Sequence, residues 1–516
     1  MTNPSSIIWF HRTNFVAAFG LLLLLIMSTI PSNSSLVQLV LAQTEAEEGS
    51  TLPATTDDTS DIQPIEEVQL PTQQGFSVQV LARNLSAPHN LLYGPDGALW
   101  ITERIGKNIT RIDPNSGEEL SSTPVPGVHQ SGGQDGLMGM AFDPDFSSTR
   151  YIYVAYTYAD EAVEEVEREL KITRFTYDPA TNTISEPFDL ITGLPGSNDH
   201  NSGRMTFGPD GMLYYTIGDQ GNNQFSRFCM EIQAQALPTA EEVAAQDWGT
   251  YQGKVLRMNP DGSIPEDNPE INGVRSHIFT YGHRNPQGIA VGPNGHLYIS
   301  EHGDKSDDEV SRLQAGGNYG WPQVAGHLDE QSAYQYVNWS GATNCEELEF
   351  DNIAPPPEGV PTMNESEFEA TNFVPPIVTF YTVENNYNFT DPACGGVDYV
   401  CWPTVAPSSV RHYTSDAIPG WNNNNTMLMT TLKAGRIFQL TLNENGTALA
   451  QDPVELFRSE DRYRDIAFGP DGRTIYVITD MGGPAQAIEG GVTTDLWNPG
   501  SVLVFRYEGD NGPMRE

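Results

Sequence analysis

A short turn motif recurs four times in this chain and constrains its fold more than any other feature. Each copy reads Gly-Pro-Asp/Asn-Gly between two runs of strand-forming residues and therefore predicts a β-hairpin. The first glycines of the copies are Gly94, Gly208, Gly292 and Gly469. The intervals of 114, 84 and 177 residues, divided by three, two and four, give about 38, 42 and 44, the length of one four-stranded propeller blade.

This repeat predicts an all-β fold, a six-bladed β-propeller of four-stranded antiparallel blades. Residues 75–508 have room for about six such blades with some long loops. The 48 glycines and 37 prolines agree with many strands separated by turns. An open array of β-sandwiches is the alternative fold.

The two ends of the chain differ from this central domain. Residues 1–42 contain two apolar stretches, 15–30 and 36–42, and predict a signal peptide. An uncleaved membrane anchor is the alternative, because the first stretch approaches spanning length. Residues 43–74 are acidic and rich in Thr and Pro, which predicts a disordered tether, and 509–516 form a C-terminal tail. We therefore expect a secreted or periplasmic protein, membrane-tethered if the first segment stays uncleaved.

The hairpin around Gly208 carries a chemical signal as well as a structural one. Asp199 and His200 precede its first strand and Asp219 follows its second. Because a hairpin brings these two ends together, the imidazole is expected to lie between two carboxylates. A histidine whose tautomer is fixed in this way is a common general base.

Cations are scarce in this chain, so their positions are informative. The sequence has 26 basic and 68 acidic residues, a net charge of −42, which argues against nucleic acid or anionic membranes as partners. Arg284 precedes the first strand of the third hairpin, and Arg462 and Arg464 precede that of the fourth. We expect these arginines to meet His200 on one face of the propeller and to bind an anionic ligand. Local salt bridges with acidic neighbours are the alternative.

Longer strings of residues match a known family. The chain resembles the soluble, calcium- and pyrroloquinoline quinone (PQQ)-dependent glucose dehydrogenases, which are secreted six-bladed propellers that oxidise aldoses to lactones. The similarity runs from about Phe76 to Tyr507. Its most specific strings are residues 133–137, 199–204, 214–221, 282–288, 316–322 and 401–409.

The resemblance implies a role for each residue of the site. His200 would take the proton from the anomeric hydroxyl, Asp219 would hold the imidazole, and Arg284 would polarise a quinone oxygen. The residues implied in sugar binding are Gln134, Asp199, Gln224, Tyr399 and Trp402. Those implied in cofactor binding are Arg284, Asn285, Thr404, Lys433, Arg462 and Arg464.

The resemblance also implies two calcium sites and a homodimer. One ion would bind the cofactor and the backbone carbonyls of Gly303 and Asp304. Asp304 stands where the family has proline. The second, structural site would use Glu309, Tyr319, the backbone oxygen of Ala325, and Asp329. From the residues alone, the acidic run at 307–309 is equally compatible with a solvated turn.

Four cysteines fit an exported, oxidised protein. The resemblance implies a disulfide between Cys394 and Cys401 that stiffens the loop carrying Tyr399. Cys229 and Cys345 do not match the family pattern, and either pairing or two free thiols is open. Phe225 replaces the aliphatic residue of the family, which favours a narrower sugar pocket.

These features together predict an enzyme that passes electrons from an aldose to PQQ and then to an external acceptor. Two other classes are compatible with a secreted calcium-binding propeller. One is a binding protein that has lost catalysis, and the other is a hydrolase such as a lactonase. His200 and the cofactor cations are all present, which favours the dehydrogenase. The sequence does not predict which sugar or which acceptor is used.

Overall fold

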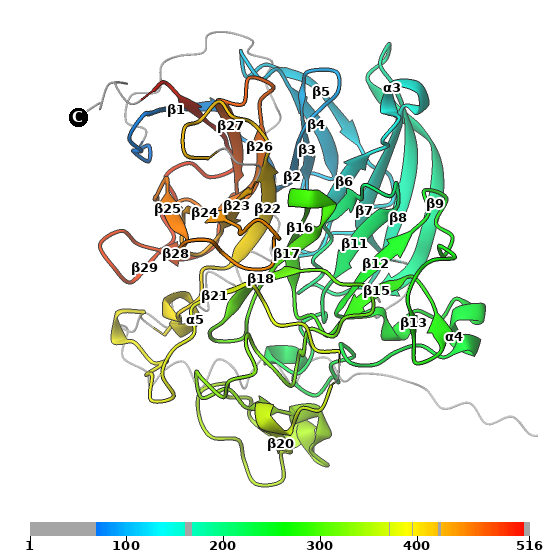
Figure 1. Cartoon of the computed structure of the whole chain (residues 1–516), viewed down its shortest axis with the longest axis vertical. Helices are drawn as coiled ribbons and strands as arrows, with labels where there is room; N and C mark the ends of the chain where they lie inside the picture. Colours follow the sequence, from blue (N-terminus) through cyan, green and yellow to red (C-terminus); the bar gives the residue numbers. More distant parts are fainter. Residues whose placement is uncertain (1–68, 160–167, 371, 395, 422–424, 510–516) are drawn as a thin grey trace, which may run out of the picture. The chain divides into compact units, whose positions relative to one another are not determined.

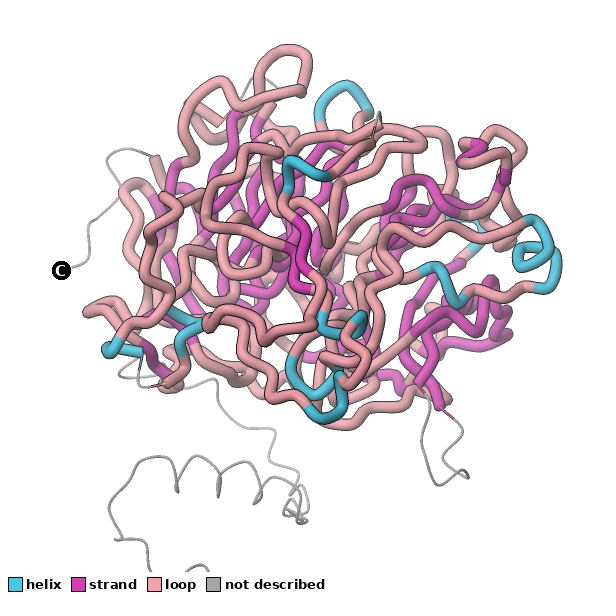
Figure 2. The backbone as a smooth tube through the Cα atoms, turned by 90° about the horizontal axis from the view of Figure 1, so that it is seen from below, coloured by secondary structure: helices cyan, strands magenta, loops and turns pink. Residues whose placement is uncertain are grey.

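The computed structural model describes residues 69–509 except 160–167, 371, 395 and 422–424. The predicted signal peptide, the tether up to residue 68 and the tail beyond 509 lie outside the described residues. The described helices are all too short to cross a lipid bilayer. Figure 2 shows that most of the chain outside the strands is loop, interrupted by short helical turns.

Six four-stranded antiparallel sheets form the fold, which confirms the predicted six-bladed propeller (Figure 1). Blade 1 is β2 (Pro88–Tyr93), β3 (Leu99–Glu103), β4 (Asn108–Ile112) and β5 (Glu119–Pro124). Blade 2 is β6 (Leu137–Phe142), β7 (Tyr151–Ala159), β8 (Arg168–Asp178) and β9 (Thr183–Pro195). Blade 3 is β10 (Met205–Phe207), β11 (Leu213–Ile217), β12 (Lys254–Met258) and β15 (Ile278–Tyr281).

The other three blades follow the same order from the inner to the outer strand. Blade 4 is β16 (Pro286–Val291), β17 (Leu297–Glu301), β18 (Asp308–Arg312) and β21 (Val378–Phe380). Blade 5 is β22 (Pro407–Tyr413), β23 (Thr426–Thr431), β24 (Ile437–Thr441) and β25 (Val454–Leu456). Blade 6 is β26 (Tyr463–Phe468), β27 (Thr474–Thr479), β30 (Val502–Tyr507) and β1 (Phe76–Ala82).

The first and last strands of the domain close the ring. β1 pairs antiparallel with β30, with Phe76 opposite Tyr507, so the N-terminal strand completes the last blade. Each inner strand contacts the inner strands of the two neighbouring blades, including β2 against β26. This pairing ties the two ends of the domain together, and the sheet edges that remain are the outer strands of the blades.

All four turn motifs form the predicted hairpins, but the blade spacing derived from them was wrong. They join the first two strands of blades 1, 3, 4 and 6. The intervals of 114, 84 and 177 residues therefore span two, one and two blades. The repeat is longer than about 40 residues because the loops are long. In blade 4, for example, β18 ends at Arg312 and β21 begins at Val378.

The apolar core lies between neighbouring sheets. Between blades 2 and 3, Tyr153 and Leu170 pack in one cluster with Tyr215 and Leu256, and all four are inaccessible to solvent. A similar cluster joins blades 5 and 6. Because each blade is covered on both faces, the apolar residues of its inner strands are buried on both sides.

A buried arginine at the inner strands connects the blades. Arg204, which directly precedes β10, is 1% exposed. Its guanidinium donates to Asp465 of β26 at 2.7 Å and to the backbone oxygens of His89, Gln287 and Ser408 at 3.0–3.2 Å. These acceptors belong to β2, β16 and β22.

The partner carboxylate of Arg204 extends the same network. Asp465 also accepts from the side chains of Asn90, Ser409 and Arg411. The side-chain oxygen of Asn90 accepts from the backbone N–H of Met140 in β6. The Arg204–Asp465 hub therefore reaches the inner strands of all six blades.

Loss of the hub should destabilise the whole propeller. Asp465→Ala leaves a buried guanidinium without its counter-charge, which costs about 3–5 kcal/mol of unfolding free energy. Urea unfolding measures this change. Glu455→Ala removes an exposed carboxylate paired with Arg436 and should cost about 0–1 kcal/mol. Equal losses in the two variants would contradict the role of the hub.

Candidate active site

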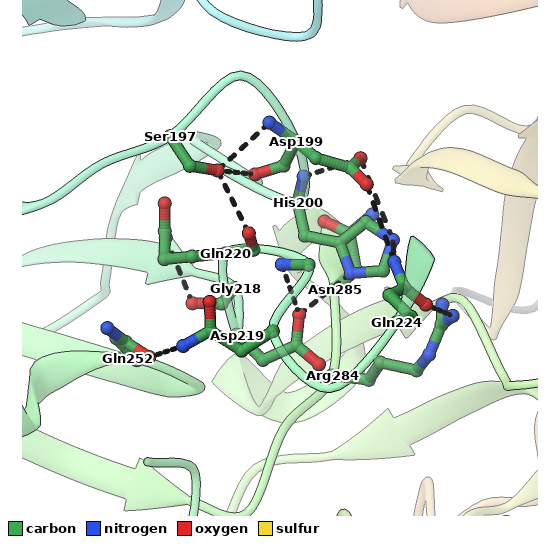
Figure 3. Close-up of polar contacts among 12 residues, drawn as sticks. Ser197, Asp199, His200, Gly218, Asp219, Gln220, Gln224, Gln252, Arg284 and Asn285 are labelled. Atoms are coloured by element: carbon green, nitrogen blue, oxygen red, sulfur yellow. Dashed lines mark hydrogen bonds and ion pairs between the residues drawn. The ribbon is translucent and has the colours of Figure 1, made fainter. Parts of the chain in front are cut away.

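His200 and Asp219 meet at the open end of the blade 3 hairpin, as the sequence predicts. His200 lies in the loop before β10 and Asp219 directly follows β11. Nδ1 of His200 is 2.7 Å from Oδ1 of Asp219, and the indole N–H of Trp321 donates to Oδ2 at 2.9 Å. Because a carboxylate accepts hydrogen bonds, this contact (Figure 3) favours the tautomer with the proton on Nδ1, which leaves Nε2 as the basic atom.

Three of the predicted sugar-binding residues surround that basic nitrogen. The side-chain amide nitrogen of Gln224 is 3.3 Å from Nε2 of His200 and 3.4 Å from Oδ2 of Asp199. Gln134 donates from its amide to the other oxygen of Asp199. Amides and a carboxylate around a base are suitable hydrogen-bond partners for sugar hydroxyls.

Arg284 and Asn285 lie next to this group, between β15 and β16. The Arg284 guanidinium donates to the side-chain oxygen of Gln224 at 3.0 Å and lies 5.3 Å above the Trp321 ring. The backbone oxygen of Arg284 accepts from the N–H of Asp219 at 2.8 Å. Figure 3 shows Arg284, Gln224 and His200 in one continuous group.

Arg462 and Arg464 join the site through Asp480 and Gln287. Asp480 lies 2.6 Å from Arg464 and 3.6 Å from Arg462. Arg464 also donates to the side chain of Gln287 at 3.3 Å, and Gln287 donates to Asn285 at 2.9 Å. The predicted convergence of the arginines is thus observed. The Asp480 carboxylate lies near both guanidinium groups. Its single negative charge therefore does not neutralise the two positive charges.

Lys433 connects the site to α5 (Asp398–Cys401) and to the loop that follows this helix. Its ammonium donates to the backbone oxygens of Tyr399 and Trp402 at 3.1 and 3.0 Å, and to the hydroxyl of Thr404. Burial lowers the pKa of Lys433 to about 7, although Asp308 opposes this shift. Tyr399 is 47% exposed and Trp402 is buried.

Several buried donors of these residues have no hydrogen-bond partner in the part of the chain that the structure describes. They are Nε of Arg284, Nε of Arg462, Nε of Arg464 and Nδ2 of Asn285. An unpaired buried N–H group costs about 1–3 kcal/mol unless a ligand satisfies it. A ligand rich in anionic oxygens fits this set of donors.

The residues expected at the first calcium site form a tight turn beside Arg284. The N–H of Gly303 donates to Asp308 at 2.8 Å, and a Cβ at Gly303 would lie 2.0 Å from the carbonyl oxygen of Ser306. The Asp304 carboxylate is 3.2 Å from Lys305 and 3.9 Å from Arg284. Burial would raise the pKa of Asp304, but these two cations outweigh it and lower the pKa.

The residues expected at the second calcium site gather around buried carboxylates. Glu309 accepts from the N–H of Gly326 at 2.8 Å, next to Ala325. Glu365 accepts from the N–H of Ala325 at 3.1 Å, and its pKa is raised to about 7 by burial and also by Asp329. Burial likewise raises the pKa of Glu309 well above its usual value. The hydroxyl of Tyr319, in contrast, donates to the backbone oxygen of Arg312.

Both disulfides form. Cys394 pairs with Cys401, as the resemblance implies, and Cys229 pairs with Cys345, a question that the residues left open. The described residues include no free cysteine. Phe225 is 55% exposed and its ring lies 5.6 Å from that of Phe350.

Sequence reasoning missed three residues that the structure adds to the site. Trp321 holds Asp219 and packs under Arg284, Asp480 joins two arginines, and Glu365 belongs to the second acidic cluster. A signal existed for Asp480, because it follows the second strand of its hairpin as Asp219 does. No sequence motif around Glu365 predicts that it lies in this acidic cluster.

Fold and site together define a six-bladed propeller with a histidine base beside a group of buried cations. The sequence model described as Glucose / Sorbosone dehydrogenase matches residues 85–348 and 383–487. Quinoprotein glucose dehydrogenase B of Acinetobacter calcoaceticus is 47% identical over 441 residues, covering 84% of this chain and 92% of that protein. The chain belongs to the glucose/sorbosone dehydrogenase family.

More distant relatives agree with this assignment. Aldose sugar dehydrogenase YliI of Escherichia coli K12 is 28% identical over 413 residues, covering 78% of this chain and 90% of that protein. The structure of the PQQ-bound form of aldose sugar dehydrogenase from Streptomyces coelicolor superimposes with a TM-score of 0.55 at 25% identity. That match covers 84% of this chain and 99% of the other.

The pKa of Lys433 predicts how an anionic ligand should respond to pH. With a pKa of about 7, the side chain is neutral above pH 7 and must take up a proton to pair with an anion. The dissociation constant for PQQ should therefore rise by up to about tenfold per pH unit above neutrality. Titration calorimetry at several pH values measures it. Lys433→Met should bind weakly with little pH dependence, and an unchanged pH slope in this variant would contradict the assignment.

Proposed function

We propose that this protein oxidises aldose sugars such as glucose at C1 to the lactone, with PQQ as redox cofactor. The electrons then pass to an external acceptor. One observation carries the proposal: a histidine base, fixed by Asp219, lies next to buried cationic donors that lack partners. A hydrolase would need no such group of unsatisfied arginines.

The donor groups of this chain suit the acidic oxygens of PQQ, and different residues would carry out different parts of the reaction. Arg462, Arg464, Lys433, Thr404 and Asn285 would hold the acidic oxygens of PQQ. When bound, PQQ supplies the acceptor for the hydride that leaves C1. Arg284 would stabilise negative charge on a quinone oxygen, because its guanidinium is already held in place by Gln224 and Trp321.

His200 would remove the proton from the anomeric hydroxyl. Its Nε2 is the unprotonated ring nitrogen, and Asp219 stabilises the imidazolium that forms. Gln134, Asp199 and Gln224 would orient the sugar by hydrogen bonds. Tyr399 and Trp402 offer ring faces to a flat quinone or to the apolar face of a pyranose.

We further propose calcium at both acidic sites. The carbonyls of Gly303 and Asp304 would bind one ion near the cofactor. Glu309, Tyr319, Ala325 and Asp329 would bind another, to which the structure suggests adding Glu365. The buried carboxylates support this proposal, because a divalent cation offsets the cost that raises their pKa values.

The domain organisation and location are also proposals. Residues 1–42 would direct export, 43–74 would be a tether, and 75–508 would be the catalytic propeller. The two disulfides support an oxidising compartment such as the periplasm or the cell exterior. Retention of the first segment as a membrane tether, and assembly as a homodimer, are proposed from sequence and family analogy.

Reconstitution tests the activity directly. The protein is mixed with PQQ and calcium, and reduction of a dye is followed on adding glucose and then other aldoses. Turnover that requires PQQ is expected. Absence of turnover with every aldose, despite bound PQQ, would contradict the proposed function.

His200→Ala should separate catalysis from cofactor binding. Loss of the base should lower kcat by about 10²–10⁴-fold, because the imidazole held by Asp219 is the group that would take the proton. The affinity for PQQ, measured by calorimetry, should change little. A variant that loses PQQ binding instead would mean that His200 holds the cofactor.

Calcium removal should affect activity and stability through different sites. Treatment with a chelator should abolish turnover and lower the melting temperature, and added calcium should restore both. Glu365→Gln should reduce the calcium-dependent gain in stability while PQQ-dependent turnover persists at high calcium. Chelated protein that keeps its full activity and melting temperature would contradict both sites.

A further inference from the structure

The residues on either side of Gln224 both have left-handed backbone conformations, which asparagine tolerates but phenylalanine disfavours. The φ angle is +62° at Asn223 and +44° at Phe225, both in the left-handed region. That region is strained for a bulky side chain such as phenylalanine. Contacts from elsewhere must therefore hold this turn in the conformation that brings Gln224 to His200 and Arg284.

A separate small unit lies beside this turn. Residues 338–361, here called the 338–361 excursion, leave the propeller between β19 (Tyr336–Val337) and β20 (Thr362–Met363). These two short strands pair and close its base. Figure 1 shows β20 at the lower edge of the molecule. The excursion has its own apolar cluster, which includes Trp339, Ala342, Cys345 and Val360.

Polar contacts and a covalent bond join this unit to the Gln224 turn. Asn223 donates to the backbone oxygen of Val337 at 2.8 Å and accepts from the N–H of Ser340 at 3.3 Å. Five residues after Gln224, Cys229 is bonded to Cys345 in the excursion, with the Cα atoms 5.7 Å apart. The turn is thus fixed on both sides of Gln224.

Aromatic rings fill the space between these anchors. The ring centroid of Phe228 lies 6.0 Å from that of Trp339 and 5.9 Å from that of Phe350. The ring centroid of Phe225 lies 5.6 Å from that of Phe350. Ring pairs at these separations are favourable beyond the area that they bury. Residues 349–382, which include Phe350, lie between the two matched parts of the family model. Part of this contact therefore lies outside the segments that the family model matches.

We propose that the excursion and the Cys229–Cys345 disulfide form a brace that positions Gln224 and so sets the affinity for the sugar. The sugar part of this proposal rests on the proposed function. Gln224 contacts His200, Asp199 and Arg284 at once, so a shift of its backbone disturbs all three contacts together. Cys229, Cys345 and Asn223 act through Gln224 and are positioning residues.

Steady-state kinetics distinguish a brace from a purely structural disulfide. Cys229→Ser/Cys345→Ser should lower kcat/KM for glucose about tenfold, mainly through a higher KM. Asn223→Ala, which keeps the disulfide, should raise KM in the same direction. In a Gln224→Ala background neither change should raise KM further, because coupled residues are not additive. Additive increases, or an unchanged KM in both variants, would overturn the proposal.

Amide hydrogen exchange tests the brace in the full chain without cofactor or sugar, and so separately from the proposed function. Removal of the disulfide or of the Asn223 side chain should speed exchange at residues 222–228 about tenfold or more. Cys394→Ser/Cys401→Ser, which removes the other disulfide, is the matched control and should leave these amides unchanged. Equal protection of residues 222–228 in all variants would overturn the brace even if the enzyme oxidises glucose.

Discussion

The contact between Arg204 and Asp465 is the interaction on which the rest of the structure depends. Both side chains are buried, and together with Asn90 they connect the inner strands of all six blades. Site residues lie only a few positions away along the same segments. Arg464 adjoins Asp465, Asn285 is two residues before Gln287, and His200 is four residues before Arg204. The register that the hub imposes on the strands therefore also sets the spacing of the site.

The arginine of the hub and the arginines of the site differ in how many of their N–H groups have hydrogen-bond partners. Arg204 uses its donors on a carboxylate and on three backbone oxygens, and none of its nitrogens lacks a partner. Arg284, Arg462 and Arg464 each keep a buried Nε without a hydrogen-bond partner among the described residues. Buried donors without a partner also occur elsewhere among the described residues. Since each such donor is costly, it is the grouping of several cationic ones in a single site that favours binding of an anionic ligand.

Local sequence predicted the parts of the fold and site that depend on single hairpins. The four turns, the pairing of His200 with Asp219 and the gathering of the arginines all follow from the geometry of a hairpin. The spacing of the blades could not be predicted in this way. Strand pairing within a sheet does not limit the length of the loops, such as the stretch between Arg312 and Val378. Lys433 and Thr404 entered through the family resemblance, since no local pattern marks them. The partners Cys229 and Cys345 are 116 residues apart, and only the folded chain shows that they meet.

Diffraction from crystals grown with PQQ and calcium would test the central claim most directly, because it locates the ligand that the unsatisfied donors require. We expect PQQ between Arg284 and the group formed by Lys433, Arg462 and Arg464, with one face of the quinone open to His200. PQQ bound elsewhere, or bound with His200 outside contact distance of both quinone and sugar, would contradict it.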